Sequence, residues 1–327
     1  MFRAVLNQIK IFPLILMPCF AQAATFTVND SGIVGDANPG DGICEITAAT
    51  GDCSLAAAID EANALGGART INFDASVSLI IPLVAYDLSS ADITIQGPGR
   101  DLLTLLANGF GILENDSISG ITLIHGGGVA TLANNATISD SKIYIPANST
   151  SVLVKNGTGS TTIDSSELIG SSSSPAAMIT TDVGGTLIVS NSTLRDHTDS
   201  SAIVANGTLT VNNSTFTNNR GGASVIQGNT SAVVIAGSHF TNNVVSTATV
   251  HATSNTASMD LSGSVFADNA LSGGNVNVDA AAIYFASNAG TLTLSRSLFT
   301  GNISPDARGI IYSEGTDVFT NVTISDN

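Results

Sequence analysis

The chain has 327 residues, with 32 glycines, no tryptophan and only 11% charged residues. Its formal net charge is −16 at pH 7, and its few basic residues form no stripe. Nucleic acid and anionic membranes are therefore not expected as partners, and acidic polysaccharides are disfavoured. No stretch beyond the N-terminus is long and apolar enough for a transmembrane helix.

Residues 1–23 have the pattern of a secretory signal peptide. Arg3 and Lys10 precede the apolar run IFPLILMPCF, and the tripeptide AQA that follows matches a cleavage site for small residues. Cleavage after this tripeptide would start the mature chain near Thr25. We therefore expect an exported protein that is extracellular or associated with the cell surface and outer membrane.

Residues 24–67 are predicted to form an N-terminal capping region that begins with a loop rich in glycine and aspartate. Cys44 and Cys53 lie nine residues apart in this loop, and in an exported protein they are expected to form one disulfide. No cofactor is expected, although the loop carries carboxylates that could bind Ca²⁺. They lack the alternating spacing of a calcium-binding loop, so a polar loop around the disulfide is the simpler interpretation. These weak candidates are Asp30, Asp36, Asp41 and Asp52.

A short helix is predicted over the segment LAAAIDEANAL. Ser54 precedes it as an N-cap, its apolar residues share one face, and two glycines, Gly66 and Gly67, end it. A solenoid must cover the apolar core at its open end. We therefore expect this helix to cap the segment that follows.

Residues 68–327 are predicted to form a parallel β-helix, because an eight-residue phrase recurs seven times at irregular intervals of 22–33 residues. The phrase reads apolar, any, apolar, any, any, Ser, any, large apolar, as in LTVNNSTF. Its serines are Ser141, Ser166, Ser192, Ser214, Ser238, Ser264 and Ser297.

The spacing within the phrase predicts a strand, a tight bend and a second strand. Leu209 and Val211 are two residues apart and share one face of a strand, whereas Phe216 follows five residues later and faces inward only if the chain bends. Turns of this kind stack in parallel at about 4.8 Å. We therefore expect an all-β coil of about ten turns. It should be right-handed, because connections between parallel strands are right-handed in nearly all proteins.

Two ladders of identical side chains are predicted along the coil. The bend serines would stack as a hydroxyl ladder. Four copies continue as Phe-x-x-Asn, which would place each Asn at the next bend in a left-handed conformation, with aligned amides bonding along the stack. These pairs are Phe216 and Asn219, Phe240 and Asn243, Phe266 and Asn269, and Phe299 and Asn302.

The segment GICEITAATGDCSLAAAIDEANALGGARTINFD resembles the CSLREA domain, which is found at the N-terminus of many exported bacterial β-helix proteins. The resemblance covers roughly residues 25–100 and implies the same placement here, although Ala56 and Ala57 replace the Arg-Glu pair that gives the family its name. The Phe-x-x-Asn elements also resemble repeats of polymorphic outer-membrane proteins, which are autotransporter-type surface proteins.

The sequence shows no catalytic constellation. The mature chain has two lysines, its four histidines are dispersed, and the seven ladder serines are alike in context, so none is a credible nucleophile. One cluster of charged and polar residues lies in the loop after one copy of the phrase and at the start of the corresponding loop of the next turn. It is a candidate ligand patch, or it is simply a solvated loop. Its members are Arg195, Asp196, His197, Asp199 and Arg220.

The leading hypothesis is a non-enzymatic β-helix of the cell surface, adhesin-like or resembling an autotransporter passenger, that binds a glycan or protein on a host or environmental surface. The alternative is a pectate-lyase-like lyase or a glycoside hydrolase on the same fold, which would gain if charged residues from three adjacent turns met in one groove. Ice binding would need regular threonine ladders, and the irregular interval disfavours it. Because NVTISDN stops inside a copy, we expect a truncated fragment, anchored through a missing C-terminal region.

Overall fold

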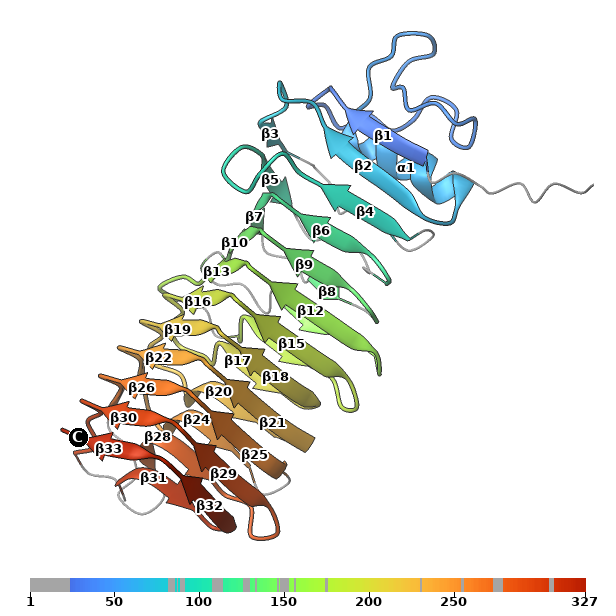
Figure 1. The fold of residues 1–327 in the computed structure, drawn as a ribbon. Helices are drawn as coiled ribbons and strands as arrows, with labels where there is room; N and C mark the ends of the chain where they lie inside the picture. The colour runs from blue at the N-terminus through green and yellow to red at the C-terminus, as the bar shows by residue number, and fades with distance from the viewer. Residues whose placement is uncertain are drawn as a thin grey trace, which may run out of the picture.

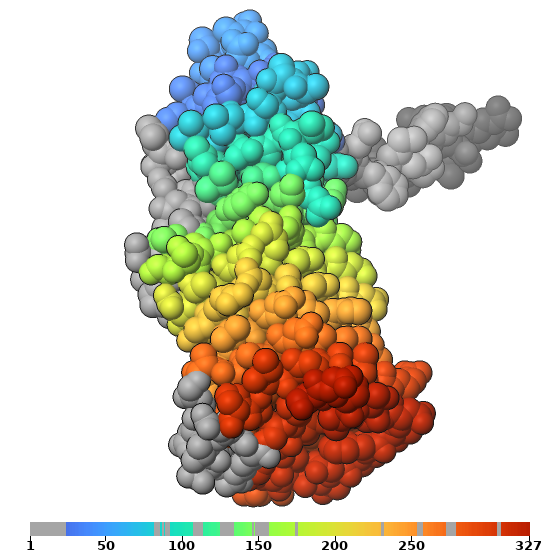
Figure 2. All heavy atoms as spheres, turned by 90° about the vertical axis from the view of Figure 1, so that its left-hand side faces the viewer, coloured from blue at the N-terminus to red at the C-terminus, as the bar shows by residue number. Residues whose placement is uncertain are grey.

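The computed structural model describes residues 24–81, 86, 88, 92–107, 114–125, 130–132, 134–145, 147, 153–155, 157–173, 176–229, 231–253, 256–272, 279–305 and 309–327. The predicted signal peptide, residues 1–23, lies outside the described residues. The chain coils into an elongated parallel β-helix, which confirms the predicted all-β solenoid (Figure 1). Its turns follow one another in sequence order along the rod (Figure 2). No helix within the described ranges is long and apolar enough to cross a membrane.

Two long sheets begin near the N-terminus, and their strands pair in parallel. The first sheet holds 12 strands: β1 (Ala24–Val28), β2 (Arg69–Phe73), β4 (Ile93–Gln96), β6 (Ser117–Ser119), β9 (Thr137–Ser139), β12 (Ser160–Asp164), β15 (Thr186–Ser190), β18 (Thr208–Asn212), β21 (Ser231–Ala236), β25 (Thr256–Ser262), β29 (Thr291–Ser295) and β32 (Thr316–Thr320). The second holds 11: β3 (Leu79–Ile80), β5 (Thr104–Ala107), β7 (Thr122–His125), β10 (Lys142–Tyr144), β13 (Glu167–Ile169), β16 (Thr193–Arg195), β19 (Thr215–Thr217), β22 (His239–Thr241), β26 (Val265–Ala267), β30 (Leu298–Thr300) and β33 (Thr323–Ser325).

A third sheet closes the coil and begins later in the chain. Its eight strands are β8 (Ala130–Leu132), β11 (Leu153–Lys155), β14 (Ile179–Thr181), β17 (Ile203–Ala205), β20 (Ser224–Gly228), β24 (Ala248–Ala252), β28 (Ala280–Phe285) and β31 (Gly309–Ser313). Two short strands, β23 (Val244–Val245) and β27 (Ala270–Leu271), form a separate pair.

The expected ten turns must be corrected to about eight that carry a strand in each of the three sheets. The described residues before β8 contribute strands to the first two sheets alone. Long intervals between the last copies of the phrase, up to 33 residues, also leave fewer turns than a uniform length of ~26 residues would give.

The bend between the first and second sheets explains the odd spacing of the phrase. Leu209 and Val211 in β18 and Phe216 in β19 are all fully buried. The residue before each ladder serine has a positive φ, which turns the chain so that both strands face the core. These residues are Asp140, Ser165, Asn191, Asn213, Gly237, Gly263 and Arg296.

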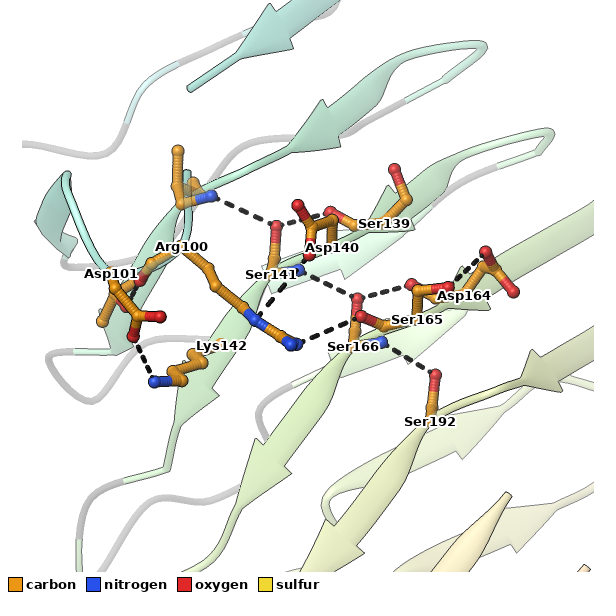
Figure 3. A network of polar contacts seen from close by, with 12 residues as sticks. Arg100, Asp101, Ser139, Asp140, Ser141, Lys142, Asp164, Ser165, Ser166 and Ser192 are labelled. Atoms are coloured by element: carbon orange, nitrogen blue, oxygen red, sulfur yellow. Dashed lines mark hydrogen bonds and ion pairs between the residues drawn. The ribbon is translucent and has the colours of Figure 1, made fainter. Parts of the chain in front are cut away.

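The seven serines are buried and connect the turns, but not by bonds between hydroxyls. The N–H of each of the first six donates to the Oγ of the serine one turn on, at 3.1–3.3 Å. Each of the seven Oγ atoms donates in turn to a backbone carbonyl two residues earlier, at 2.6–3.2 Å. Figure 3 shows this alternation at Ser141, Ser166 and Ser192. The hydroxyl thus satisfies both a donor and an acceptor of the buried bend backbone.

The Phe-x-x-Asn elements form a second, inner pair of columns. The four rings are fully buried and stack at 4.7–4.9 Å between centroids. Each Asn amide bonds to the Asn of the next turn and to a carbonyl of the turn before, as when Asn243 donates to Asn269 Oδ1 (2.9 Å) and to the Phe216 carbonyl (3.0 Å). The left-handed residue at this bend is the one before the ladder Asn, such as Asn218 or Asn242, and not the ladder Asn as expected.

The N-terminal region is continuous with the first sheet. β1 pairs with β2 although 40 residues, including α1 (Leu55–Leu65), separate them. Ser54 Oγ accepts from the Ala57 N–H at 3.1 Å as the N-cap, and α1 contacts β1 and β2. The buried carboxylate of Glu61 accepts N–H bonds from Gly40 and Gly42 and so fastens the loop to the helix. The predicted disulfide between Cys44 and Cys53 is confirmed.

Replacing Asn243 with Ala should destabilise the coil. The change leaves the Asn219 N–H without its buried partner, which costs about 1–3 kcal/mol, and it also removes the amide bonds from Asn243 to Phe216 and Asn269. We expect the free energy of unfolding in urea to fall by roughly 3–5 kcal/mol. The control Thr241→Ala, on the outer face of β22, should cost under about 1 kcal/mol. Equal losses in the two variants would contradict a stabilising amide ladder.

Asp116 should make stability depend on pH. Burial raises its pKa to about 7, the nearby Asp92 and Glu114 add to this, and its Oδ1 accepts from the Ile93 N–H at 2.5 Å. Between pH 4 and 7 the folded state therefore holds a proton that the unfolded state has lost. The free energy of unfolding should fall as pH rises through this window, by at most about 1.4 kcal/mol per pKa unit.

The variant Asp116→Asn removes this titration, so its unfolding free energy relative to wild type should improve steadily between pH 4 and 7. Urea unfolding across this pH range measures the difference. The exposed Asp260→Asn is the control, and a constant offset for Asp116→Asn would contradict the assignment.

Candidate functional site

The structure places His197 apart from the charged members of the predicted ligand patch, because its side chain is in the core. His197 is fully buried and occupies, one turn earlier, the position of the ladder Asn. Its N–H donates to Asn219 Oδ1 at 3.2 Å, and its Nε2 lies 3.0 Å from the Ala176 carbonyl. Burial lowers the pKa of His197. His197 therefore belongs to the core and not to a surface patch.

The charged members of the patch remain at the surface but bond to one another. Arg195 pairs with Glu167 at 2.7 Å and with Asp196. Asp196 also accepts from Asn218 Nδ2 at 2.5 Å, and Asn218 Oδ1 accepts from Arg220 Nε at 2.9 Å. These groups tie three turns together along the edge of the second sheet.

The remaining patch residue, Asp199, has a positive φ, and its N–H donates to the Arg220 carbonyl at 2.9 Å, which makes it a turn residue. A similar set of ion pairs lies nearer the N-terminus, where Arg100 pairs with Asp140 at 3.7 Å and Lys142 pairs with Asp101 (Figure 3). Exposed ion pairs of this kind contribute little to stability, and their presence alone does not indicate a catalytic role.

Three of the four calcium candidates shape turns. Asp52 is exposed, and the other three accept N–H bonds from residues two positions on: Asp30 from Gly32 (2.6 Å), Asp36 from Asn38 (2.8 Å) and Asp41 from Ile43 (2.9 Å). Within the described part of the chain, no group of three or more His, Cys, Asp or Glu side chains could hold a metal ion.

A groove on the outer face of the third sheet, near the C-terminal end, is the candidate site that the sequence did not reveal. We call it the third-sheet groove. Its volume is about 440 Å³, within the range of small-molecule sites. The residues that line it come from three adjacent turns: Thr247, His251, Thr253, Asp279, Tyr284, Ala286 and Glu314.

An aromatic column forms one wall of the groove. Strand register places His251, Tyr284 and Tyr312 side by side on β24, β28 and β31. The His251 ring meets Tyr284 edge-on at 5.1 Å, and Tyr312 stacks on Tyr284 at 5.0 Å. Because each ring packs against the next, the column is held in place, and 8% of Tyr284 remains exposed.

Two carboxylates accompany the rings. Glu314 is exposed and accepts from the Tyr312 hydroxyl at 3.1 Å, which orients it at the groove. Asp279 is almost fully buried and lies near His251. Burial lowers the pKa of His251 more than Asp279 raises it, and Nδ1 of His251 is buried without a hydrogen-bond partner. The imidazole is therefore neutral at pH 7.

The groove has the size for a small polar ligand. Its two carboxylates come from two adjacent turns, whereas the enzyme hypothesis predicts charged groups from three adjacent turns in one groove. None of the described lining residues is Lys or Arg.

Sequence reasoning missed Tyr284, Tyr312, Asp279 and Glu314 because the third sheet carries no copy of the phrase. Without the phrase, nothing in the sequence aligns these residues across turns. The available indication was length, since the longest interval between copies of the phrase, 33 residues, falls in this part of the chain.

Comparisons with known proteins find one similar solved structure and no matching family. No protein-family model matches the chain, and no curated protein matches it. One solved structure is similar, the catalytic domain of a GH87 alpha-1,3-glucanase variant in complex with nigerose. The identity is 11%, the TM-score is 0.32, and the match covers 77% of this chain and 65% of that one, less than two thirds of its length.

Replacing His197 with Asn should extend the amide ladder and change the response to acid. Because burial holds the folded pKa of His197 below 6.5, the unfolded state binds a proton first as pH falls, and stability is lost below pH 6.5. In the variant, the free energy of unfolding should fall less between pH 7.5 and pH 5 than in wild type, as measured by urea unfolding at the two pH values. The control His239→Asn, exposed on β22, should follow wild type, and an unchanged decline in His197→Asn would contradict the prediction.

Proposed function

We propose that this chain is an exported, non-enzymatic β-helix of the cell surface, adhesin-like, that binds a glycan in the third-sheet groove. The observation that supports this most is the joint presence of a supported aromatic wall and two carboxylates in one groove. The apolar C–H groups of a sugar pack against aromatic rings, and its hydroxyls donate to carboxylates. The ligand would belong to a host or environmental surface.

The rest of the chain fits a supporting role under this proposal. Residues 24–67, with their resemblance to the CSLREA domain, would form the capping region, in which α1 covers the N-terminal end of the core. Twelve strands in the first sheet at about 4.8 Å give a rod of about 50 Å that holds the groove far from this cap. Residues 1–23 would direct the chain out of the cell.

A polysaccharide-active enzyme is the second candidate, and the pair Asp279 and Glu314 is the observation that favours it. Glycoside hydrolases use two carboxylates on either side of the scissile bond. A hydrolase fits better than a pectate-lyase-like enzyme, because none of the described lining residues is the Lys or Arg that a lyase would use as its base.

Substitution of Tyr284 by Ala should weaken glycan binding. Removing the ring and the edge of the column should lower affinity about ten-fold, the loss expected for one aromatic contact of about 1.4 kcal/mol. Binding to a panel of immobilised neutral, amino-sugar and acidic polysaccharides measures this. The control is Tyr144→Ala, a tyrosine 38% exposed on the second sheet. Wild-type protein that binds no member of the panel would contradict the proposal.

Hydrolysis separates the two candidates. The binding proposal expects no new reducing ends when the protein is incubated with each polysaccharide of the panel. Release of reducing ends that disappears in Asp279→Asn or Glu314→Gln would replace the binding proposal with the enzyme.

A further inference from the structure

We propose that the outer face of the first sheet, over its first five strands, binds ice. The strands are β1, β2, β4, β6 and β9, and each contributes two outward residues that are exposed or partly exposed. Eight of these ten residues carry a hydroxyl, the other two carry an amide, and none is charged or aromatic. We call this surface the hydroxyl face, and its residues are Thr25, Thr27, Thr70, Asn72, Thr94, Gln96, Ser117, Ser119, Thr137 and Ser139.

Strand pairing arranges the hydroxyl face in two straight columns. The column Thr25, Thr70, Thr94, Ser117 and Thr137 pairs residue for residue from strand to strand, with no shift of register. Thr25 and Thr70 are 45 residues apart in the sequence, whereas Ser117 and Thr137 are only 20 apart. The unequal intervals are therefore absorbed outside this sheet, and they do not prevent the regular array of hydroxyls that ice binding requires.

The hydroxyl face has a fixed geometry. Its hydroxyl and amide groups repeat at about 4.8 Å along the rod and at about 6.6 Å, two residues, along each strand. The strands run side by side in nearly the same direction (Figure 1). Ser117 Oγ donates to Thr94 Oγ1 at 3.1 Å, and the branched Thr side chain has few rotamers. The inward neighbours anchor the strands and are at most 5% exposed: Phe26, Ile71, Ile95, Ile118 and Ile138.

A fixed array of single hydroxyls matches a lattice of water better than it matches liquid water. Each hydroxyl offers one donor and two acceptor sites, and each Thr adds a methyl group. Holding a water molecule in place costs entropy, so isolated hydroxyls gain little by ordering the liquid. In ice the water molecules are already held in place, and the weak contacts of a rigid face add together.

The absence of charge selects an uncharged partner. The chain has a formal net charge of −16, and the outer face of the second sheet carries ion pairs such as Arg195 with Glu167. Covering a charge with a partner that supplies no opposite charge costs free energy. In the two columns of the first sheet, carboxylates appear only beyond the hydroxyl face, at Asp164 and Asp260. An uncharged lattice can therefore cover the hydroxyl face without desolvating an ion.

A crystalline polysaccharide is the other uncharged lattice. Sugar rings pack their C–H groups against aromatic side chains, and none of the ten residues of the hydroxyl face is aromatic. The small hydroxyl and methyl groups of this face therefore favour ice over a polysaccharide crystal.

The test measures the fraction of protein that a slowly growing ice crystal takes up from solution. Wild-type protein should enter the ice. Thr94→Lys places a long charged side chain in the middle of the face and should lower uptake about ten-fold, the effect of losing one or two hydrogen-bonded contacts. Thr137→Val, which keeps the shape and removes one hydroxyl, should lower it by less. The control Thr215→Lys makes the same change on the outer face of the second sheet and should leave uptake unchanged.

Urea unfolding checks that each variant is folded, and Thr137→Val decides the matter if Thr94→Lys is not. Exclusion of wild-type protein from ice would overturn the proposal. Unchanged uptake in the folded variants of the hydroxyl face, or an equal loss in Thr215→Lys, would also overturn it. Binding to microcrystalline cellulose or chitin that Thr94→Lys abolishes, without uptake into ice, would replace ice with a polysaccharide crystal. The third-sheet groove lies on another sheet, so none of these outcomes depends on the proposed glycan binding.

Discussion

The structure depends on one constraint, which is that the backbone at each inward bend must find its hydrogen bonds in the adjacent turn. The bends between the first and second sheets are buried, and a buried N–H without a partner costs about 1–3 kcal/mol. Ser and Asn meet this demand because one short side chain both accepts from a neighbouring turn and donates to a carbonyl. Asn243, for example, accepts two bonds from Asn219 and donates to Asn269 and Phe216.

This constraint also determines which side chains fill the core. Apart from Thr161, every described inward position of the phrase is filled by an apolar side chain or by a ladder residue. His197 illustrates this, because its polar neighbours in the sequence suggest a surface loop, while its spacing of three residues after Leu194 places it in the ladder. Polar side chains available to a ligand must therefore face outward.

The sequence was sufficient to predict the coil but not the groove, because the phrase covers the first two sheets and not the third. The phrase repeats at fixed internal spacing, so the burial of Leu209, Val211 and Phe216 follows from counting residues. The left-handed residue was placed one position late because αL propensity suggests the recurring Asn of Phe-x-x-Asn, whereas the fold uses Asn218 to turn and Asn219 to bond. Tyr284 and Tyr312 are neighbours only through strand pairing, which no local pattern encodes.

The position of the groove follows from which part of a turn can change length. From the first residue of the phrase to the ladder position is ten residues in each of five turns, from Leu187 to His197 through Leu292 to Asn302. The serine and asparagine ladders bind the middle and the end of this arc to the turns above and below, so an insertion there would break two columns of buried bonds. Variation in length is therefore confined to the remaining arc, which contains the third sheet, and the longest interval, 33 residues, includes Asp279 and Tyr284 of the groove. A rod with uniform ladders can thus add a binding site without disturbing its core, but only on this side.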